Sequence, residues 1–553
     1  MLRTFTRKYG KIALGLALAG SASIPIYSVI QYNSTPLPTD LDPILTAGDA
    51  AALLKQNKRN FEAVQKLELL YGVDPMSNSD ISSLIMQSDR VVLCKLALHG
   101  SHLFSLHPAS IVSKNQLNLA RKANEDNEED LLMYQGLNSI FSKSENSLGA
   151  LGFYDYVICD ENDLNCLERD KFKKHWGRDQ KIVAPLIKGI ELTGSTDCSE
   201  FLEKDLLNVL LNIYLNHRAD LAKGKNPVTR RVCQLVMKIM GNIAKSKPAG
   251  LDYIIYSPWW ALLHEMINSP KSGEEPYWAR KVVHNMLFAL GGEEVCYSSD
   301  VIELHRPQDG EEPLVDIVLV HGIQGSGLTT WRSNDSIKTK KTKSWISEWL
   351  VPEIKTPVRV IASDYVSSFR TLRGLKEGLP HRARRLEKEF VECGIGQRPV
   401  LWIAHSLGGI IIKRILNTNP EILSKTVGIL FISTPHRGSP LADFFGRFGN
   451  VTDDVKMLKH NNLENNKIHN SFLAIANDIP LFVSVGETIK HDIVRAYHMV
   501  PPESAFFEKG AFYHFNSNHI DISKAKDRND PVFKVVKSFI NDGIRIIKEE
   551  NKK

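Results

Sequence analysis

The sequence predicts a protein of mixed α/β class in two parts, a helical region followed by a parallel sheet with helices on both faces. Two patterns support this. Apolar residues recur at helical spacing through most of residues 40–300, and from Pro313 onward short β-rich runs alternate with helical segments. The composition, 43% hydrophobic and 24% charged over 553 residues, is that of a globular chain with two or three domains.

An uncharged stretch, residues 12–30, follows a basic N-terminal end, and no acidic residue precedes Asp40. The pattern fits a membrane anchor, a cleaved secretory signal or an Arg-containing mitochondrial presequence. The stretch approaches the roughly 20 residues that span a bilayer, although the small residues 19–23 could also serve a signal peptidase. We expect residues 1–38 to be a targeting segment that forms a single-pass anchor.

The region 40–300 is expected to be all helical. Residues 232–243 and 282–290 each place apolar side chains on one helical face, and residues 206–215 are apolar nearly all round. Residues 83–98 form a further strong segment. Paired helices of this kind are similar to armadillo or HEAT repeats, with an irregular helical domain as the alternative because no clean internal repeat is present. Such a domain could bind a protein partner.

Charge and cysteine content exclude several classes of protein. A net charge of +6 over this length does not require nucleic acid, and no base-reading motif is present. The seven cysteines lack C-x-x-C spacing, which argues against a zinc site or a disulfide framework. Most are expected in the core, while Cys159 and Cys166 could pair in an oxidising compartment. We therefore expect no metal, no organic cofactor and no nucleic-acid partner.

The segment 301–553 carries the α/β pattern. Helices are expected at residues 382–391, 410–416 and 534–547. The expected strands are residues 314–320, 358–362, 399–405, 427–433, 479–485 and 511–515.

A candidate nucleophile, Ser406, lies where one of these strands turns sharply into a helix. In a nucleophile elbow the residues two before and two after the serine must be small, and Ala404 and Gly408 meet that requirement. Ala404 stands where esterases commonly have glycine, which makes the elbow strained rather than forbidden. The amide of Leu407 can point at an oxyanion beside Ser406. A serine in an ordinary loop is the alternative.

A second turn, His321-Gly322, follows the first parallel strand. In an α/β-hydrolase a backbone amide after that strand completes the oxyanion hole, and Ile323 is the candidate donor. The turn is common by itself, but it precedes the elbow of Ser406 in the order that an α/β-hydrolase requires. We therefore predict an α/β-hydrolase fold at the C-terminus, preceded by the armadillo-like domain and the membrane segment.

Five motifs occur along the α/β segment. They are Val-His-Gly-Ile at 320–323, Trp-Ile-Ala-His-Ser-Leu-Gly-Gly at 402–409, Ser-Thr-Pro-His-Arg-Gly-Ser at 433–439, Val-Pro-Pro-Glu-Ser-Ala at 500–505 and Asn-His at 518–519. Together they resemble the serine active site-containing protein family and, more broadly, GPI inositol-deacylase-type esterases. The resemblance implies a membrane-associated protein of mitochondria or of their contact sites with the endoplasmic reticulum, linked to phosphatidylglycerol remodelling and sterol handling.

His519 is the candidate catalytic base because it follows the last expected strand, where the histidine of such a triad is found. His514 is a rival, but its place within an apolar alternation indicates packing. His436 precedes every candidate acid, so it is a site-shaping residue or a structural histidine of its turn. His405, next to Ser406, is expected to pack beneath the nucleophile.

The acid has three candidates between the serine and the histidine. A carboxylate must hold one tautomer of the histidine and stabilise the imidazolium. Glu487 directly follows a strand, Asp492 lies shortly after it, and Glu503 belongs to the motif that the resemblance favours. Glu503 is the expected acid, with Glu487 and Asp492 as alternatives.

These residues predict a membrane-associated serine hydrolase or transacylase that acts on lipid esters. The insertion 438–478 could carry a lid, where Phe444, Phe445 and Phe448 either contact an acyl chain or pack as a small core. The basic run 338–343 could attract anionic headgroups. The alternative is an inactive scaffold in which the hydrolase fold is only architecture and the helices bind a partner.

Overall fold

A computed structural model describes most of the chain after residue 74, and all described residues belong to one compact unit, residues 50–553. The expected targeting segment, the basic run 338–343 and the phenylalanines at 444, 445 and 448 lie outside the described residues. So do Cys159 and Cys166. The described ranges are 75–125, 185–194, 197–221, 227–246, 250–269, 274–307, 311–333, 344–367, 378–440, 452–490 and 498–552, with isolated helical residues at 64, 67–69, 71, 136–137, 140–141, 182–183 and 442.

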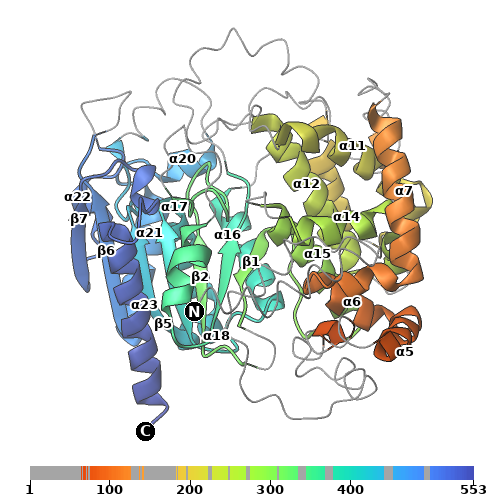
Figure 1. Ribbon diagram of the computed structural model, residues 1–553. Coiled ribbons are helices and arrows are strands. Elements are labelled where there is room, and N and C mark those ends of the chain that lie inside the picture. The colour runs from red at the N-terminus through yellow and green to blue at the C-terminus, as the bar shows by residue number, and fades with distance from the viewer. Residues whose placement is uncertain are drawn as a thin grey trace. The chain divides into compact units, whose positions relative to one another are not determined.

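The first part of the described chain is helical, as expected, and its helices pack in pairs (Figure 1). The contacts join α7 to α14, α11 to α12, α12 to α15 and α14 to α15. The side chains of Trp259 and Trp260, which are adjacent in the sequence, are fully buried among these helices. The helices are α5 (Pro75–Met86), α6 (Arg90–Leu98), α7 (Pro108–Glu125), α10 (Ser199–Glu203), α11 (Leu206–Leu221), α12 (Pro227–Ala244), α13 (Leu251–Ile255), α14 (Pro258–Ile267) and α15 (Glu275–Ala289).

One expected helix, residues 83–98, is in fact two. Helix α5 ends at Met86, and Asp89 caps α6 because its side chain accepts a hydrogen bond of 3.0 Å from the amide of Val92. Residues 87–90 at this break are all polar, and aspartate is a residue type that favours an N-cap. None of the helices in the described ranges has both the length and the apolar character needed to cross a bilayer.

The second part contains a sheet whose order is β1-β3-β2-β4-β5-β6-β7 in the described chain. Strand β1 pairs antiparallel with β3, and the other pairs are parallel. The sequence pattern did not predict β1, which precedes the first expected strand. The strands are β1 (Val301–His305), β2 (Val315–Val320), β3 (Val358–Ser363), β4 (Val400–His405), β5 (Thr426–Ile432), β6 (Leu481–Glu487) and β7 (Ala511–Phe515).

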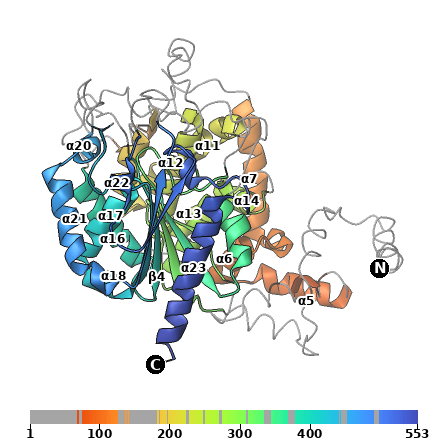
Figure 2. The same cartoon turned by 90° about the vertical axis from the view of Figure 1, so that its left-hand side faces the viewer.

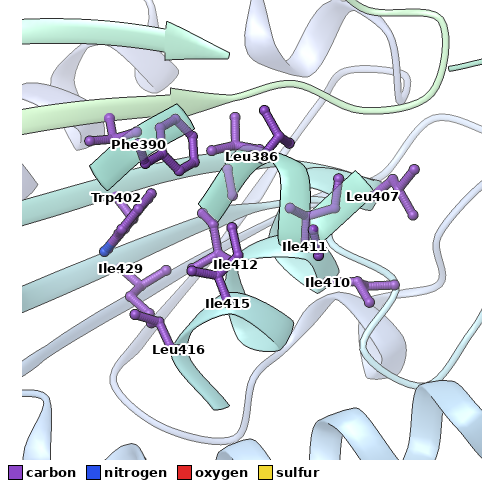
Figure 3. Packing of buried hydrophobic residues seen from close by; sticks show 14 of the residues in the cluster. Leu386, Phe390, Trp402, Leu407, Ile410, Ile411, Ile412, Ile415, Leu416 and Ile429 are labelled. Atoms are coloured by element: carbon purple, nitrogen blue, oxygen red, sulfur yellow. The ribbon is translucent and has the colours of Figure 1, made fainter. Parts of the chain in front are cut away.

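Helices cover both faces of this sheet (Figure 2). Neighbouring residues of a strand point to opposite faces, so Trp402 joins the cluster with α16 and α17 while Leu401 packs against Gly543 of α23. Figure 3 shows the α17 side of this core. The helices are α16 (Leu379–Glu392), α17 (Leu407–Thr418), α18 (Pro420–Lys425), α20 (Asp453–Met457), α21 (Leu463–Ile475), α22 (Pro502–Ala505) and α23 (Pro531–Glu550).

The parallel strands all end at the same edge of the sheet, where an open α/β sheet places its functional loops. Ser406 follows β4, Glu487 ends β6, and His519 lies in the loop after β7. The turn of His321 follows β2 at the same edge. The topology and the order of these residues are those of an α/β-hydrolase.

Candidate active site

Ser406 lies at the sharp turn between β4 and α17 with a backbone φ of 54° and ψ of −124°. A positive φ is strained for a residue with a Cβ, and such strain of about 1–3 kcal/mol is characteristic of functional sites. Its amide donates to the carbonyl oxygen of Ile432 at 2.9 Å, which fixes the turn against β5. The expected elbow is therefore present.

Gly408 explains why this elbow needs a small residue. A Cβ at this position would lie 2.3 Å from the carbonyl oxygen of Val320 and 2.7 Å from that of His321, so any side chain would force α17 away from the end of β2. Ala404 is fully buried in β4 and is accommodated there. The close approach of α17 places the amide of Leu407, in its first turn, beside Ser406.

His519 forms the hydrogen bond that a catalytic base requires. Its Nε2 lies 2.9 Å from Oγ of Ser406, and both residues are buried. On its other side, Nδ1 lies 2.7 Å from Oε2 of Glu487. With the carboxylate accepting from Nδ1–H, Nε2 is free to accept the hydroxyl proton of Ser406. Asn518 caps this turn by accepting from the amides of Ile520 and Asp521.

The carboxylate beside the histidine is Glu487, which corrects the choice of Glu503. Glu487 is completely buried at the end of β6, whereas Glu503 is exposed on α22. The motif around Glu503 still contributes to the site, because the neighbouring amide of Val500 donates to Oε1 of Glu487 at 2.9 Å. The third candidate, Asp492, lies outside the described residues.

Glu487 is held ionised despite its burial. Burial by itself would raise the pKa of this carboxyl, but the facing His519 and the amide of Val500 outweigh it and hold the pKa below its ordinary value. The carboxylate can therefore fix the histidine tautomer at neutral pH.

His405 holds the loop that carries the base. Its Nε2–H donates to the carbonyl oxygen of His519 at 2.9 Å, and the two rings lie 4.9 Å apart. Burial, followed by the neighbouring His519, lowers the pKa of His405 well below its usual range, so the ring is neutral. The expectation that His405 packs beneath the nucleophile thus understates its contact with the base.

The loop after β2 passes directly against the nucleophile. A Cβ on Gly322 would lie 2.6 Å from Cβ of Ser406. The amide of Gly325 bonds to the carbonyl oxygen of Gly322 at 3.1 Å, and Gln324 has a φ of 61°. This turn does not use the amide of Ile323 for its own hydrogen bond. The amides of Ile323 and Leu407 stay the predicted donors of an oxyanion hole.

His321 fixes the start of this loop. Its Nδ1–H donates to the carbonyl oxygen of Gly322 at 2.8 Å, and its ring stacks on Tyr365 with the centroids 4.0 Å apart. Burial lowers the pKa of His321 to about 4, so the imidazole is neutral. It shapes the loop through the backbone.

Two other candidate histidines lie away from the nucleophile. His436 is buried, with Nδ1 3.2 Å from Nζ of Lys413, and belongs to a structural cluster under α17. His514 packs against Phe512 with the ring centroids 4.3 Å apart, as the apolar alternation indicates, but its side chain is exposed on β7. Across the ranges that the structure describes, no group of three or more His, Cys, Asp or Glu side chains could hold a metal ion.

Comparison with known proteins gives relatives for part of the chain. It is 27% identical to human Protein SERAC1 over 380 residues, which cover 63% of this chain and 56% of the human protein. The chain is similar to SERAC1 proteins. Mouse Protein SERAC1 is 28% identical over 341 residues, which cover 56% of this chain and 51% of the mouse protein. The chain thus matches a little over half the length of these curated relatives. The relation to GPI inositol-deacylases stays a prediction, and no family model matches.

Among solved structures, similarity extends over less than half of the chain. Phospholipase PlaB from Legionella pneumophila is 14% identical with a TM-score of 0.32, covering 43% of this chain and 63% of that one. The mature lipase BlEst2 from Bacillus licheniformis is 16% identical with a TM-score of 0.31, covering 43% of this chain and 97% of that one.

Several groups that build the site were not predicted from the sequence. They are the amide of Val500, the hydroxyl of Tyr365, the Oγ of Ser367 and the carboxylate of Asp364. The amide of Val500 acts on the carboxylate of Glu487, and the other three act on backbone atoms of the loop after β2. No local motif marks such a contact, since only the fold brings the segments together.

Proposed function

We propose that the protein is a serine hydrolase of esters in which Ser406 is the nucleophile, His519 the general base and Glu487 the orienting acid. The observation that carries the proposal is the continuous hydrogen-bonded series from Ser406 through His519 to Glu487, with distances of 2.9 and 2.7 Å. The strained backbone of Ser406 agrees with it, because such strain is kept where geometry serves chemistry.

The first half of the reaction forms an acyl-enzyme. His519 takes the hydroxyl proton of Ser406 at Nε2 while Oγ attacks the ester carbonyl carbon. The amides of Leu407 and Ile323 donate to the oxyanion of the tetrahedral intermediate. Glu487 stabilises the imidazolium. The alkoxide leaving group takes the proton back from Nε2 as it departs.

The second half returns the serine. Water, activated by His519, attacks the acyl carbon and releases a carboxylic acid. An alcohol such as the hydroxyl of a second lipid gives a new ester by the same steps, which would make the protein a transacylase. Both outcomes need only these residues.

The proposed substrate is a lipid ester, with phosphatidylglycerol as the first to test. This choice follows the motif resemblance and the similarity to SERAC1 proteins. The proposed location is a membrane of mitochondria or of their contacts with the endoplasmic reticulum, through the uncharged residues 12–30. A protein partner on the helical region belongs to the same proposal.

The experiment compares wild type with Ser406→Ala. A fluorophosphonate probe should label the wild type, and vesicles containing phosphatidylglycerol should release fatty acid or exchange acyl groups. In Ser406→Ala labelling should disappear and turnover should fall by about 10⁶-fold, as for other serine triads. The melting temperature should stay near the wild-type value, since only a hydroxyl is removed.

The matched control is Ser424→Ala, which removes an exposed serine hydroxyl on α18. It should retain both labelling and turnover. Wild-type protein that is neither labelled nor active, although it is folded, would favour the inactive scaffold instead. Turnover retained in Ser406→Ala would assign the nucleophile to another residue.

A further inference from the structure

Helix α12 docks against the α/β region through polar side chains. Gln234 and Lys238 lie one turn apart on the same face of this helix. Lys238 is almost completely buried, and its Nζ lies 2.8 Å from Oδ1 of Asp300, just before β1. Burying an ammonium group costs free energy unless the group is paired, so the folded state requires the ion pair between Lys238 and Asp300.

The two carboxylate oxygens of Asp364 contact different regions of the protein. Oδ2 accepts from Nε2 of Gln234 at 2.5 Å and lies 3.3 Å from Nζ of Lys238. Oδ1 accepts at 3.0 Å from the amide of Gly327, in the loop that follows Ile323. One carboxylate thus joins a helix of the first region to the loop beside the nucleophile.

The segment that begins at Asp364 holds this loop at several further points. The hydroxyl of Tyr365 donates to the carbonyl oxygen of His321. Ser367 accepts from the amide of Gln324 at 3.1 Å and donates to the carbonyl oxygen of Gly322 at 3.3 Å. The backbone before and after Ile323 is therefore fixed from residues 364–367, and residue 364 is fixed from α12.

The charge of Asp364 makes this connection strong. Burial would raise the pKa of its carboxyl, but Lys238 and the amide of Gly327 lower it below its ordinary value, so the group is ionised. Hydrogen bonds to a charged group contribute more than those between neutral groups. The position of the Gly327 amide should therefore depend on Lys238.

We propose that Asp364, held by Lys238 and Gln234, is a positioning residue that sets the geometry of the oxyanion loop, so that the helical region controls the chemical step. The catalytic part of this inference rests on the proposed hydrolase function. The helical region then acts on turnover through one buried carboxylate, and a ligand that shifts α12 changes the rate.

The test compares Asp364→Asn and Lys238→Met with Lys238→Arg, which keeps the charge. Turnover of a soluble ester such as p-nitrophenyl butyrate is measured together with inhibition by a trifluoromethyl ketone, which forms a tetrahedral adduct with a serine nucleophile. We expect kcat to fall by about 10- to 100-fold in Asp364→Asn and Lys238→Met with KM unchanged, because a displaced oxyanion donor acts on the transition state. The inhibition constant should rise by a similar factor, and Lys238→Arg should recover most of the activity.

Asp316→Asn is the matched control. Asp316 is fully buried and pairs with Arg359 at 2.7 Å. Both lie near the N-terminal ends of β2 and β3, at the edge of the sheet opposite to Ser406. This variant should lose stability as the others do but keep kcat and the inhibition constant. If Asp364→Asn does not fold, Gln234→Leu removes one hydrogen bond to the same carboxylate without leaving a new buried charge, and is measured in its place.

Hydrogen exchange separates this inference from the proposed function. Peptides covering residues 321–330 should exchange faster in Asp364→Asn than in Asp316→Asn, whether or not the protein hydrolyses esters. Unchanged exchange, or an unchanged kcat and inhibition constant in a folded Asp364→Asn, would overturn the positioning role. An inactive wild type with the expected exchange difference would reject only the hydrolase and with it the catalytic consequence.

Discussion

At the scale of single residues, the site depends on how Glu487 reaches His519. Glu487 is the last residue of β6, so its side chain emerges at the edge where the loop after β7 returns. A strand end inside the sheet fixes a carboxylate more firmly than the short exposed helix that carries Glu503. The amide of Val500 occupies Oε1 and leaves Oε2 for the histidine.

This geometry predicts a clear ranking of two variants. Glu487→Gln should reduce kcat by about 10⁴-fold, as in other serine triads, because a neutral amide supports the wrong tautomer of His519. Glu503→Gln should stay close to wild type because its side chain is exposed. Both are measured by ester turnover beside thermal melting. The opposite ranking would return the acid role to Glu503.

The residues of the site differ in how well the sequence predicts them. Ser406 and Gly408 could be found because an elbow is a local pattern with a steric cause. His519 followed from chain order. The acid was predicted wrongly as Glu503, since only the fold shows that Glu487, at the end of β6, faces the histidine. Asp364 carries no motif, because its partners are more than a hundred residues away on one side.

At the scale of elements, α17 combines the proposed nucleophile Ser406 at its N-terminus with a fully buried lysine. This lysine is Lys413. Its Nζ lies 3.2 Å from Nδ1 of His436 and 3.3 Å from Nδ1 of His469, which is on α21. Burial lowers the pKa of Lys413 to about 7. Burial followed by Lys413 lowers the pKa of both histidines, that of His469 to about 3, so they remain neutral acceptors.

The stability of the protein should therefore depend on pH through Lys413. Between about pH 7 and the ordinary lysine pKa of about 10.4, the unfolded chain binds a proton that the folded chain does not. This contribution makes the free energy of unfolding rise with pH across that range, while below about pH 7 the full cost of burying the charge is present. Lys413→Met should lose this part of the slope, worth roughly 2–5 kcal/mol. Urea unfolding at several pH values measures it.

The control for this measurement is Lys425→Met, which replaces an exposed lysine on α18. Its pH profile should parallel that of the wild type. A Lys413→Met profile parallel to the wild type would show that this lysine does not titrate differently in the folded state.

The elements themselves were largely predictable, for physical reasons. Strands β2 to β6 are buried on both faces, so each appears as a mostly apolar run, interrupted in β2 and β3 by the buried pair Asp316 and Arg359. Helix α23 shows a clear apolar face. Strand β1 was not predicted because it is short and contains polar residues such as Glu303. Its pairing with β3 depends on the fold rather than on its own pattern.

At the scale of the whole molecule, the helical and α/β regions share buried charged and polar contacts. Lys281 of α15 donates to the carbonyl oxygen of Ser299 at 3.0 Å, and Lys238 pairs with Asp300. The predicted division near residue 300 therefore passes through a charged network. Composition and periodicity could locate the change of pattern there but not this network, because lysines on a helix usually indicate a solvated face.

The predicted membrane anchor, residues 12–30, should determine whether the whole protein stays with the membrane. With residues 12–30 in place, the protein should remain in the membrane pellet after alkaline carbonate extraction, because a stretch near 20 uncharged residues can span the hydrocarbon core. A chain without these residues should move to the supernatant. A mature N-terminus found after residue 23 would indicate cleavage, and would contradict the anchor.

The position of Gly322 has a consequence for reading related genomes. A single methyl group there would come within 2.6 Å of the Cβ of Ser406, so the loop or the serine would have to move. A duplicated gene could therefore lose its chemistry by one alanine at this position while its serine, histidine and glutamate all remain. We therefore expect residue 322 to distinguish copies with the proposed activity from copies without it, even where Ser406, His519 and Glu487 are all present.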